Sequence, residues 1–382
     1  MIRPKKYHNT ASGILRSRIK SNFIRFTCVI PVPCIPFMRY KHLILFAGIS
    51  MTSCLSLLAQ QKTPRIEILA SGTNTHLRGL SVVNDNVVWV SGHNGTVGRT
   101  TNGGKTWQWR VVKGFEKTDF RDIEAFDAST AIIMGIAEPA YMLKTTDGGE
   151  SWIVVYENKT KGMFLDAMEF WNEHSGIVIG DPIKGRFFIS RTFNGGDSWQ
   201  DIPFDKRPVA DSGEACFAAS GTNIRVLDKD EAVFVSGGLK SRMFTKNEPV
   251  PLPIAQGKET TGANSLAVLD KAKRNGGRKM IVVGGDFSTD TSVVKNCFYT
   301  NDGGITWYPS LVPPHGYRSC VEYYSKTEAF ACGLNGVDRT TDGGKTWVWI
   351  SKESFHVCRA SKLGGAVYLA GANGKVGKIV WK

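Results

Sequence analysis

The sequence predicts an all-β protein, a β-propeller of seven four-stranded blades, and two observations support this prediction. An eight-residue pattern, Thr-x-[Asp/Asn]-Gly-Gly-x-[Ser/Thr]-Trp, occurs five times in the 382 residues. Its final residues, Trp107, Trp152, Trp199, Trp307 and Trp347, are 45, 47, 108 and 40 residues apart. A repeat of about 40–50 residues with one turn signature per unit is typical of propeller blades, which must stack on their neighbours to bury both faces.

Each copy of the pattern is predicted to form the tip of a hairpin. The Asp or Asn is expected to bond its own backbone two residues on, the paired glycines to adopt positive φ, and the hydroxyl before the Trp to tie down the loop. The Trp then begins the next strand and buries a large ring. The residues assigned to this structural role are Asn102, Trp107, Asp147, Trp152, Asn194, Trp199, Asp302, Trp307, Asp342 and Trp347.

Between these turns the chain divides into seven units of alternating strands. They span residues 77–110, 120–156, 164–202, 214–254, 262–310 and 316–350, with a seventh from 355 onward. The fourth unit keeps Thr245 and Asn247 but continues Glu248-Pro249, so its turn has decayed and the interval of 108 covers two blades. The seventh stops one strand short, and residues 65–69 are predicted to supply that strand and close the ring. Six blades is the alternative.

The first 59 residues are interpreted as a leader. The net charge of the chain is +14, and nine Lys or Arg but no Asp or Glu lie before residue 60. A charged start at Arg39 and Lys41, an apolar stretch at 43–58 and Leu57-Leu58-Ala59 as a cleavage point form the pattern of a secretory signal. The predicted division is a basic extension or mis-assigned start at 1–37, a signal peptide at 38–59 and a propeller domain at 60–382.

This leader leads us to expect an exported protein, periplasmic or extracellular, that meets the membrane only transiently through its signal peptide. The apolar stretch is short for a spanning helix, which needs about 20 residues. A lipid anchor at Cys54 is the weaker interpretation, because Met51-Thr52-Ser53 matches a lipobox only in part. Beyond the leader no run of Lys and Arg predicts nucleic-acid binding. A monomer is expected.

The cysteines predict neither a metal site nor a disulfide framework. Five of the eight follow residue 59, and they show no C-x-x-C and no ligand spacing with His. We interpret them as small buried hydrophobic residues. Cys320 and Cys332 lie on adjacent predicted strands of one blade, and the sequence leaves open whether they pair. No cofactor is predicted.

The five turn octets resemble the Asp-box of the BNR-repeat and sialidase-type propellers. The form Thr-Thr-Asp-Gly-Gly-Lys-Thr-Trp at 340–347 is most similar to propellers of the photosystem II assembly factor type. The resemblance covers most of the chain from about Arg65 and implies the fold. It implies chaperone-like partner binding rather than a reaction, because the box lies on the outer rim in those families.

Alignment of the units places three arginines, Arg78, Arg121 and Arg318, at equivalent starts of innermost strands. Arginines that converge near the axis would bind an anionic ligand by charge and bidentate hydrogen bonds. The alternative is that each pairs with a local carboxylate and joins neighbouring blades. The residues assigned to ligand or partner binding are Arg78, Arg121, Arg318, Asp122, Asp166 and Arg186.

A second candidate set lies in the loops between the second and third strands. Units two, three and five carry longer loops there with Glu138, Asp181 and Asp286, whereas units one, six and seven have a short Gly-x-Asn-Gly turn. These three acids are the candidate catalytic residues of a glycosidase, which needs two carboxylates about 5 Å apart or more. A sialidase is disfavoured, because Pro64-Arg65-Ile66-Glu67 lacks the aromatic residue and final Pro of its motif. Ordinary loop divergence is the alternative.

These observations favour an exported, non-enzymatic propeller that acts as a binding or assembly module for a protein or an extracellular glycan. A secreted glycoside hydrolase of the sialidase or xyloglucanase-like class is the alternative. The two differ in whether the loop carboxylates face each other across a cleft.

Overall fold

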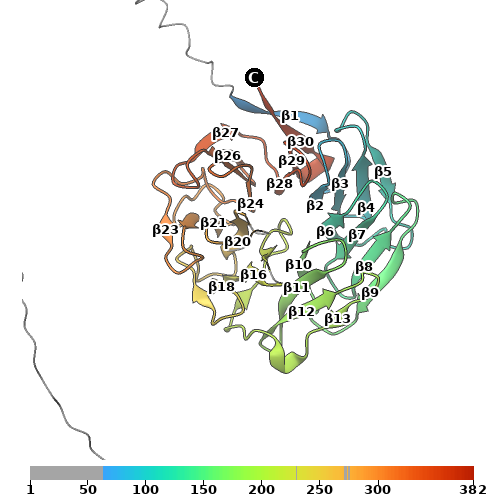
Figure 1. The fold of residues 1–382 in the computed structure, drawn as a ribbon, viewed down its shortest axis with the longest axis horizontal. Coiled ribbons are helices and arrows are strands. Elements are labelled where there is room, and N and C mark those ends of the chain that lie inside the picture. The colour runs from blue at the N-terminus through green and yellow to red at the C-terminus, as the bar shows by residue number, and fades with distance from the viewer. Residues whose placement is uncertain (1–62, 229, 271–272, 274–275) are drawn as a thin grey trace, which may run out of the picture. The chain divides into compact units, whose positions relative to one another are not determined.

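A computed structural model describes residues 63–382, except for 229, 271–272 and 274–275. The predicted basic extension and signal peptide lie outside these residues. The chain divides into two units, Met1–Gln61 and Lys62–Lys382, of which the second is the subject below. Within its described residues, seven antiparallel sheets are arranged radially around one axis, so the seven-bladed propeller is confirmed (Figure 1).

The first three blades follow the chain in order, each with its innermost strand first. Blade 1 contains β2 (Leu77–Val82), β3 (Val88–Gly92), β4 (Thr96–Thr100) and β5 (Gln108–Val111). Blade 2 contains β6 (Phe120–Ala125), β7 (Ala131–Gly135), β8 (Ala140–Thr145) and β9 (Ile153–Asn158). Blade 3 contains β10 (Leu165–Phe170), β11 (Gly176–Ile183), β12 (Arg186–Thr192) and β13 (Gln200–Asp201).

The next three blades keep this order with one addition. Blade 4 contains β15 (Ile224–Val226), β16 (Ala232–Val235), β18 (Arg242–Phe244) and β19 (Val250–Pro251). Blade 5 contains β20 (Thr261–Val268), β21 (Met280–Asp286), β22 (Cys297–Thr300) and β23 (Tyr308–Pro309), and its sheet is extended by β17 (Gly237–Gly238) and β14 (Glu214–Ala215). Blade 6 contains β24 (Cys320–Tyr323), β25 (Ala329–Gly333), β26 (Gly336–Thr340) and β27 (Val348–Ser351).

The seventh blade closes the ring. It contains β28 (Val357–Ala360), β29 (Val367–Ala370) and β30 (Val376–Trp381). Its outer strand is β1 (Pro64–Ala70), which pairs antiparallel with β30 from Pro64 opposite Trp381 to Ala70 opposite Val376. The N-terminal strand therefore covers the edge that β30 would otherwise expose, as the sequence predicts.

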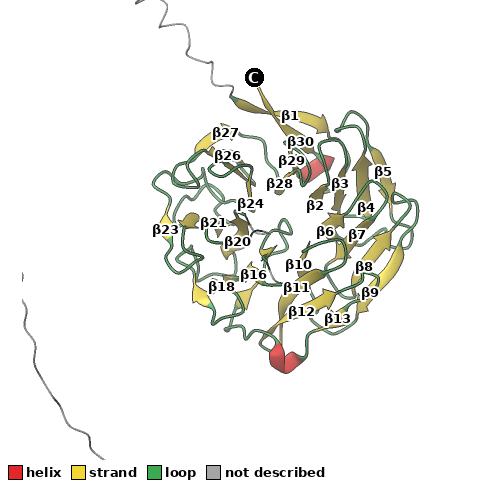
Figure 2. Cartoon of the chain, in the orientation of Figure 1, coloured by secondary structure: helices red, strands yellow, loops and turns green. Residues whose placement is uncertain are grey.

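Helical structure is almost absent from the described residues. Two short 3-10 turns, η1 (Phe204–Lys206) and η2 (Ala372–Gly374), interrupt the strands (Figure 2). No helix in this part of the chain has the length and apolar character needed to cross a bilayer.

The five repeated octets form the expected tips, with one difference in hydrogen bonding. In each, the first Thr hydroxyl donates to the Asx oxygen and accepts the N–H of the second glycine. The Asx oxygen accepts the N–H four residues on, rather than two. The longer ring forms because both glycines adopt positive φ, for example 76° at Gly343 and 94° at Gly344.

The core lies between blades rather than within them. Trp152 packs on a cluster shared by blades 1 and 2, Trp307 on one shared by blades 4 and 5, and Trp347 on one shared by blades 5 and 6. Each of these rings lies between two neighbouring sheets, as predicted. Blade 7 packs against blade 1 through a hydrophobic cluster that includes Tyr368 and Leu80.

The prediction that unit four begins with a strand at Glu214 is wrong in its boundary. The innermost strand of blade 4 is β15, which starts at Ile224, and Glu214 lies on β14. Glu214 is held there because its carboxylate accepts hydrogen bonds from Ser236 and Arg242. The intervening segment, 216–223, runs past the axis and supplies part of the site described next.

Candidate functional site

A pocket of about 260 Å³ opens at the axis, at the end of the propeller where the innermost strands begin. Its walls come from segments preceding or starting β2, β6, β15, β20, β24 and β28 and from the loops after β21 and β25, so most of the ring contributes to it. The lining residues include two arginines, several aromatic rings and no Asp or Glu: Arg78, Arg121, Phe217, Ala218, Ala219, Asn264, Phe287, Tyr317, Ser319, Leu334 and His356. The pocket is therefore cationic and largely apolar.

Backbone bulges explain why both arginines reach the axis. The pairing of β2 with β3 shifts between Leu77 and Gly79, and that of β6 with β7 shifts between Phe120 and Asp122. A bulge leaves the extra residue unpaired and redirects its side chain. Arg78 and Arg121 are these extra residues.

Only some of the hydrogen-bond donors of the Arg78 guanidinium have a partner within the described part of the protein. Its Nη1 donates to the Ala219 carbonyl at 3.1 Å, and its buried Nε has no partner among the described residues. Burial and the neighbouring Arg121 charge lower the pKa of Arg78, but an arginine stays protonated at any physiological pH. Arg78 is thus a partly buried cation with unused hydrogen-bond donors.

Arg121 is oriented by a carboxylate behind it. Its Nε donates to Asp119 at 2.7 Å, and the same Asp119 oxygen lies 2.9 Å from His93 Nε2. The guanidinium carbon of Arg121 also lies 5.8 Å from the centre of the Phe164 ring. These contacts hold the side chain without using its terminal nitrogens.

Aromatic rings form the opposite wall. Phe217 and Phe287 meet edge to face at 6.0 Å, and Phe287 meets Tyr317 at 6.2 Å. The Tyr317 hydroxyl donates to Asn264 Oδ1 at 2.7 Å, and burial raises the pKa of Tyr317, so this ring remains neutral. The wall excludes water and strengthens electrostatic interactions with the arginines.

His356 adds a neutral polar atom to the pocket. Its Nε2 is buried and has no partner among the described residues. Burial, and then the charge of Arg78, lower the pKa of His356 to about 3, so the imidazole is uncharged at neutral pH. The sequence does not single out His93 or His356, because their proximity to the arginines depends on how the ring closes.

Arg318 lies elsewhere. Blade 6 has no bulge at this position because β24 begins two residues later, and the Arg318 side chain is fully buried within the blade. Its Nε donates to Asp338 Oδ2 at 2.6 Å and its Nη1 to the Tyr317 carbonyl at 2.7 Å. Two of the three predicted arginines therefore meet at the axis, while Arg318 follows the alternative of pairing with a local carboxylate.

The other predicted binding residues do not line the pocket. Asp122 is buried between blades and accepts the N–H groups of Ile123 at 2.9 Å and Met168 at 2.8 Å. Burial raises the pKa of Asp122 to about 7. Asp166 is fully buried, and burial followed by the nearby Asp181 raises its pKa. Arg186, at the start of β12, donates to the Arg207 carbonyl at 2.6 Å and lies over the Phe204 ring.

Each of the three candidate catalytic acids accepts a hydrogen bond from another group of the protein. Glu138 accepts the Gly162 N–H. Asp181 accepts the Cys216 N–H at 2.9 Å, and burial raises its pKa to about 6. Asp286 accepts hydrogen bonds from Ser288, which lower its pKa against the effect of burial. None of the three lines the axial pocket.

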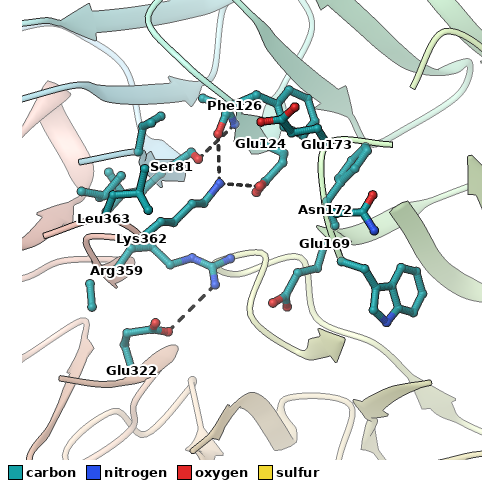
Figure 3. Close-up of a pocket in the computed structure, with 17 residues that line it drawn as sticks. Ser81, Glu124, Phe126, Glu169, Asn172, Glu173, Glu322, Arg359, Lys362 and Leu363 are labelled. Carbon is teal, nitrogen blue, oxygen red and sulfur yellow. Dashed lines mark hydrogen bonds and ion pairs between the residues drawn. The ribbon is translucent and has the colours of Figure 1, made fainter. Parts of the chain in front are cut away.

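The opposite end of the axis holds a second pocket of about 330 Å³ (Figure 3). It lies where the innermost strands of blades 1 to 3, 6 and 7 end, and four acids and two bases line it: Glu124, Glu169, Glu173, Glu322, Arg359 and Lys362. Lys362 pairs with Glu124, and Arg359 lies 4.0 Å from Glu322. Acids outnumber bases on this wall, so the pocket does not share the cationic character of the Arg78 end. The sequence did not predict it, because these residues lie at strand ends and the two candidate sets were placed at strand starts and in the loops between second and third strands.

Comparisons with known proteins agree with this architecture. The family model for the photosynthesis system II assembly factor YCF48 matches residues 59–162, and the BNR/Asp-box repeat model matches residues 298–309. The chain resembles the Asp-box propellers of the photosystem II assembly factor type. No curated protein matches its sequence.

Solved structures similar to this Asp-box propeller include two of YCF48. One is YCF48 bound to a D1 peptide, with a TM-score of 0.59, 18% identity, and coverage of 85% of this chain and 99% of that one. The other, from Cyanidioschyzon merolae, has a TM-score of 0.59, 18% identity, and coverage of 82% and 98%. The WD40 propeller domain of Doa1 has a TM-score of 0.55, 12% identity, and coverage of 83% and 97%. At these identities the likeness concerns the fold.

Proposed function

We propose that this Asp-box propeller is a non-enzymatic binding module that takes a carboxylate-bearing segment of a partner protein into its axial pocket. The observation that carries the proposal is the pair of Arg78 and Arg121, which line a pocket without any acidic residue. An arginine fork binds a carboxylate through two parallel hydrogen bonds, and these are stronger where water is excluded.

The ligand chemistry follows from the two walls of the pocket. The arginines suit a C-terminal carboxylate or an Asp or Glu side chain, and the rings of Phe217 and Phe287 suit an adjoining apolar side chain. A neutral glycan, the other partner considered from the sequence, offers no charge to match the arginines. A volume of about 260 Å³ accommodates one or two residues of a peptide, rather than a folded domain.

Two further observations support a binding role over catalysis. YCF48, which shares this fold, has been solved with a D1 peptide bound, so a propeller of this kind can present a peptide site. The glycoside hydrolase alternative is not favoured, because Glu138, Asp181 and Asp286 accept hydrogen bonds from other groups of the protein and do not line the axial pocket.

Binding is tested with a fluorescein-labelled library of peptides that have free C-termini, measured by fluorescence polarisation. The protein is expected to select peptides with an acidic or free C-terminal residue beside an apolar one. Arg78→Gln combined with Arg121→Gln is expected to weaken the selected peptides at least tenfold. Each lost charge-assisted hydrogen bond contributes about 1.5–3 kcal/mol.

A matched control separates this site from general surface charge. Lys113→Gln removes one exposed positive charge just after β5, outside the arginine pocket, and is expected to leave affinity within twofold. Equal weakening by Lys113→Gln, or full affinity in the double arginine variant, would contradict the assignment.

We further propose that the protein is exported, on the basis of the signal pattern at 38–59. N-terminal sequencing of the protein recovered from the envelope or medium is expected to begin at Gln60, after Ala59. A mature chain that retains Met1 and stays with the cytosolic fraction would refute export.

A further inference from the structure

Three of the buried cysteines meet at one point between blades 6 and 7. Cys320 lies on β24, Cys332 opposite it on β25, and Cys358 on β28 of the next blade. Their three Sγ atoms all lie within 4.8 Å of one another, and those of Cys320 and Cys358 are 3.7 Å apart. All three are free thiols with 0% exposure.

The distances between the three sulfur atoms match those around a bound metal ion better than the S–S distance of a disulfide. A disulfide needs an S–S distance of about 2.05 Å. A metal–thiolate bond is about 2.3 Å, and three sulfurs at that distance around a trigonal ion lie about 4 Å from one another. The observed separations are of this size, so an ion at the centre would require little movement.

Hydrogen-bond donors lie near one of the three sulfur atoms, that of Cys320. The Cys358 N–H lies 3.3 Å from Cys320 Sγ, and the Thr222 hydroxyl lies 3.6 Å from it. Hydrogen bonds to sulfur favour the thiolate, the form that binds metals.

The donor set restricts which metal fits. Among the described residues the group contains three cysteines and no fourth Cys, His, Asp or Glu. Structural zinc is almost always four-coordinate, whereas soft thiolate ligands also select Cu(I).

We propose that Cys320, Cys332 and Cys358 form a buried trigonal site for a soft monovalent metal ion, Cu(I). Binding displaces the thiol protons of the three cysteines to solvent and transfers no electrons. The three cysteines lie between two blades and do not themselves line the Arg78 pocket, and the existence of the site does not depend on peptide binding.

The test is an anaerobic titration of the fully reduced protein with Cu(I), in competition with bicinchoninate, after refolding in the presence of the ion. The wild type is expected to hold one more equivalent of Cu(I) than Cys320→Ala. This difference is the readout because Cys28, Cys34 and Cys54 of the leader are also present in the full chain. X-ray absorption is expected to show three sulfur neighbours at about 2.3 Å.

Two controls keep the result decisive. Cys216→Ala removes a buried cysteine outside the group and is expected to retain the extra equivalent. Because Cys320→Ala could disturb the core, Cys358→Ala is measured as well, and circular dichroism must show folded protein. Equal Cu(I) content in the wild type and a folded cluster variant, or preference for Zn(II) over Cu(I), would overturn the proposal.

Discussion

Replacing Arg318 by alanine is expected to lower the free energy of unfolding by about 3–5 kcal/mol, because the change leaves a buried carboxylate without its partner. The side chains of Arg318 and Asp338 are 0% and 2% exposed. Among the described residues, the other hydrogen bond that Asp338 accepts is the longer one from the His315 N–H, at 3.2 Å. Urea unfolding followed by tryptophan fluorescence measures the loss.

The same experiment distinguishes a buried pair from a surface pair. Arg110→Ala breaks the more exposed pair with Glu150 and is expected to change stability by less than about 1 kcal/mol. Combining Arg318→Ala with Asp338→Ala is expected to restore part of the loss, because the unpaired charge is then absent. A loss under 1 kcal/mol for Arg318→Ala alone would show that Asp338 finds another partner.

Replacing Asp122 by asparagine is expected to flatten the pH dependence of stability between about pH 4 and pH 7. Burial raises the pKa of Asp122 from 3.8 to about 7, so in this range the folded state holds a proton that the unfolded state has lost. Stability contributed by this group is fully present below pH 4 and is lost as the pH rises toward 7. One such proton corresponds to about 1.4 kcal/mol per pH unit.

Other charged groups also influence the pH dependence of stability, so the slope of each single variant must be compared with that of the wild type. Arg359 favours the ionised form of Asp122 and Glu124 opposes it. Burial lowers the pKa of His93, which contributes a slope of opposite sign near pH 6. Asp85→Asn serves as a control, since hydrogen bonds from Gly365 and Ala366 outweigh burial and lower its pKa out of this window. Identical slopes for Asp122→Asn and the wild type would refute the assignment.

The fold could be predicted because its strongest signals are local. The turn octets specify positive φ at paired glycines and a fixed set of hydrogen bonds within eight residues, and their spacing then counts the blades. Closure by β1 also followed, since the last unit lacked one strand. The boundary of unit four was missed because Glu214 does begin a strand, β14, but this strand extends the sheet of blade 5, and 216–223 then passes the axis before β15 begins.

The site could be predicted only in part because it depends on backbone bulges and on contacts across the ring. Arg78 and Arg121 were found from their place at strand starts, but nothing in the sequence shows that bulges direct them inward while Arg318 turns into its own blade. Phe217 and Phe287 were not predicted to bind a ligand, because their contact depends on the segment 216–223 passing the axis. The cysteine triangle was missed for the same reason, since its members lie 12 and 26 residues apart without a ligand motif.

The most direct measurement of where the protein binds its partner is photocrosslinking. A peptide selected from the free C-terminal library would carry benzophenone beside its terminal residue, and the adducts would be mapped by mass spectrometry. Binding in the arginine pocket predicts adducts on Phe217, Phe287 or Leu334, which line it. Adducts on Phe126 or Leu363, which line the pocket at the opposite end, would contradict it.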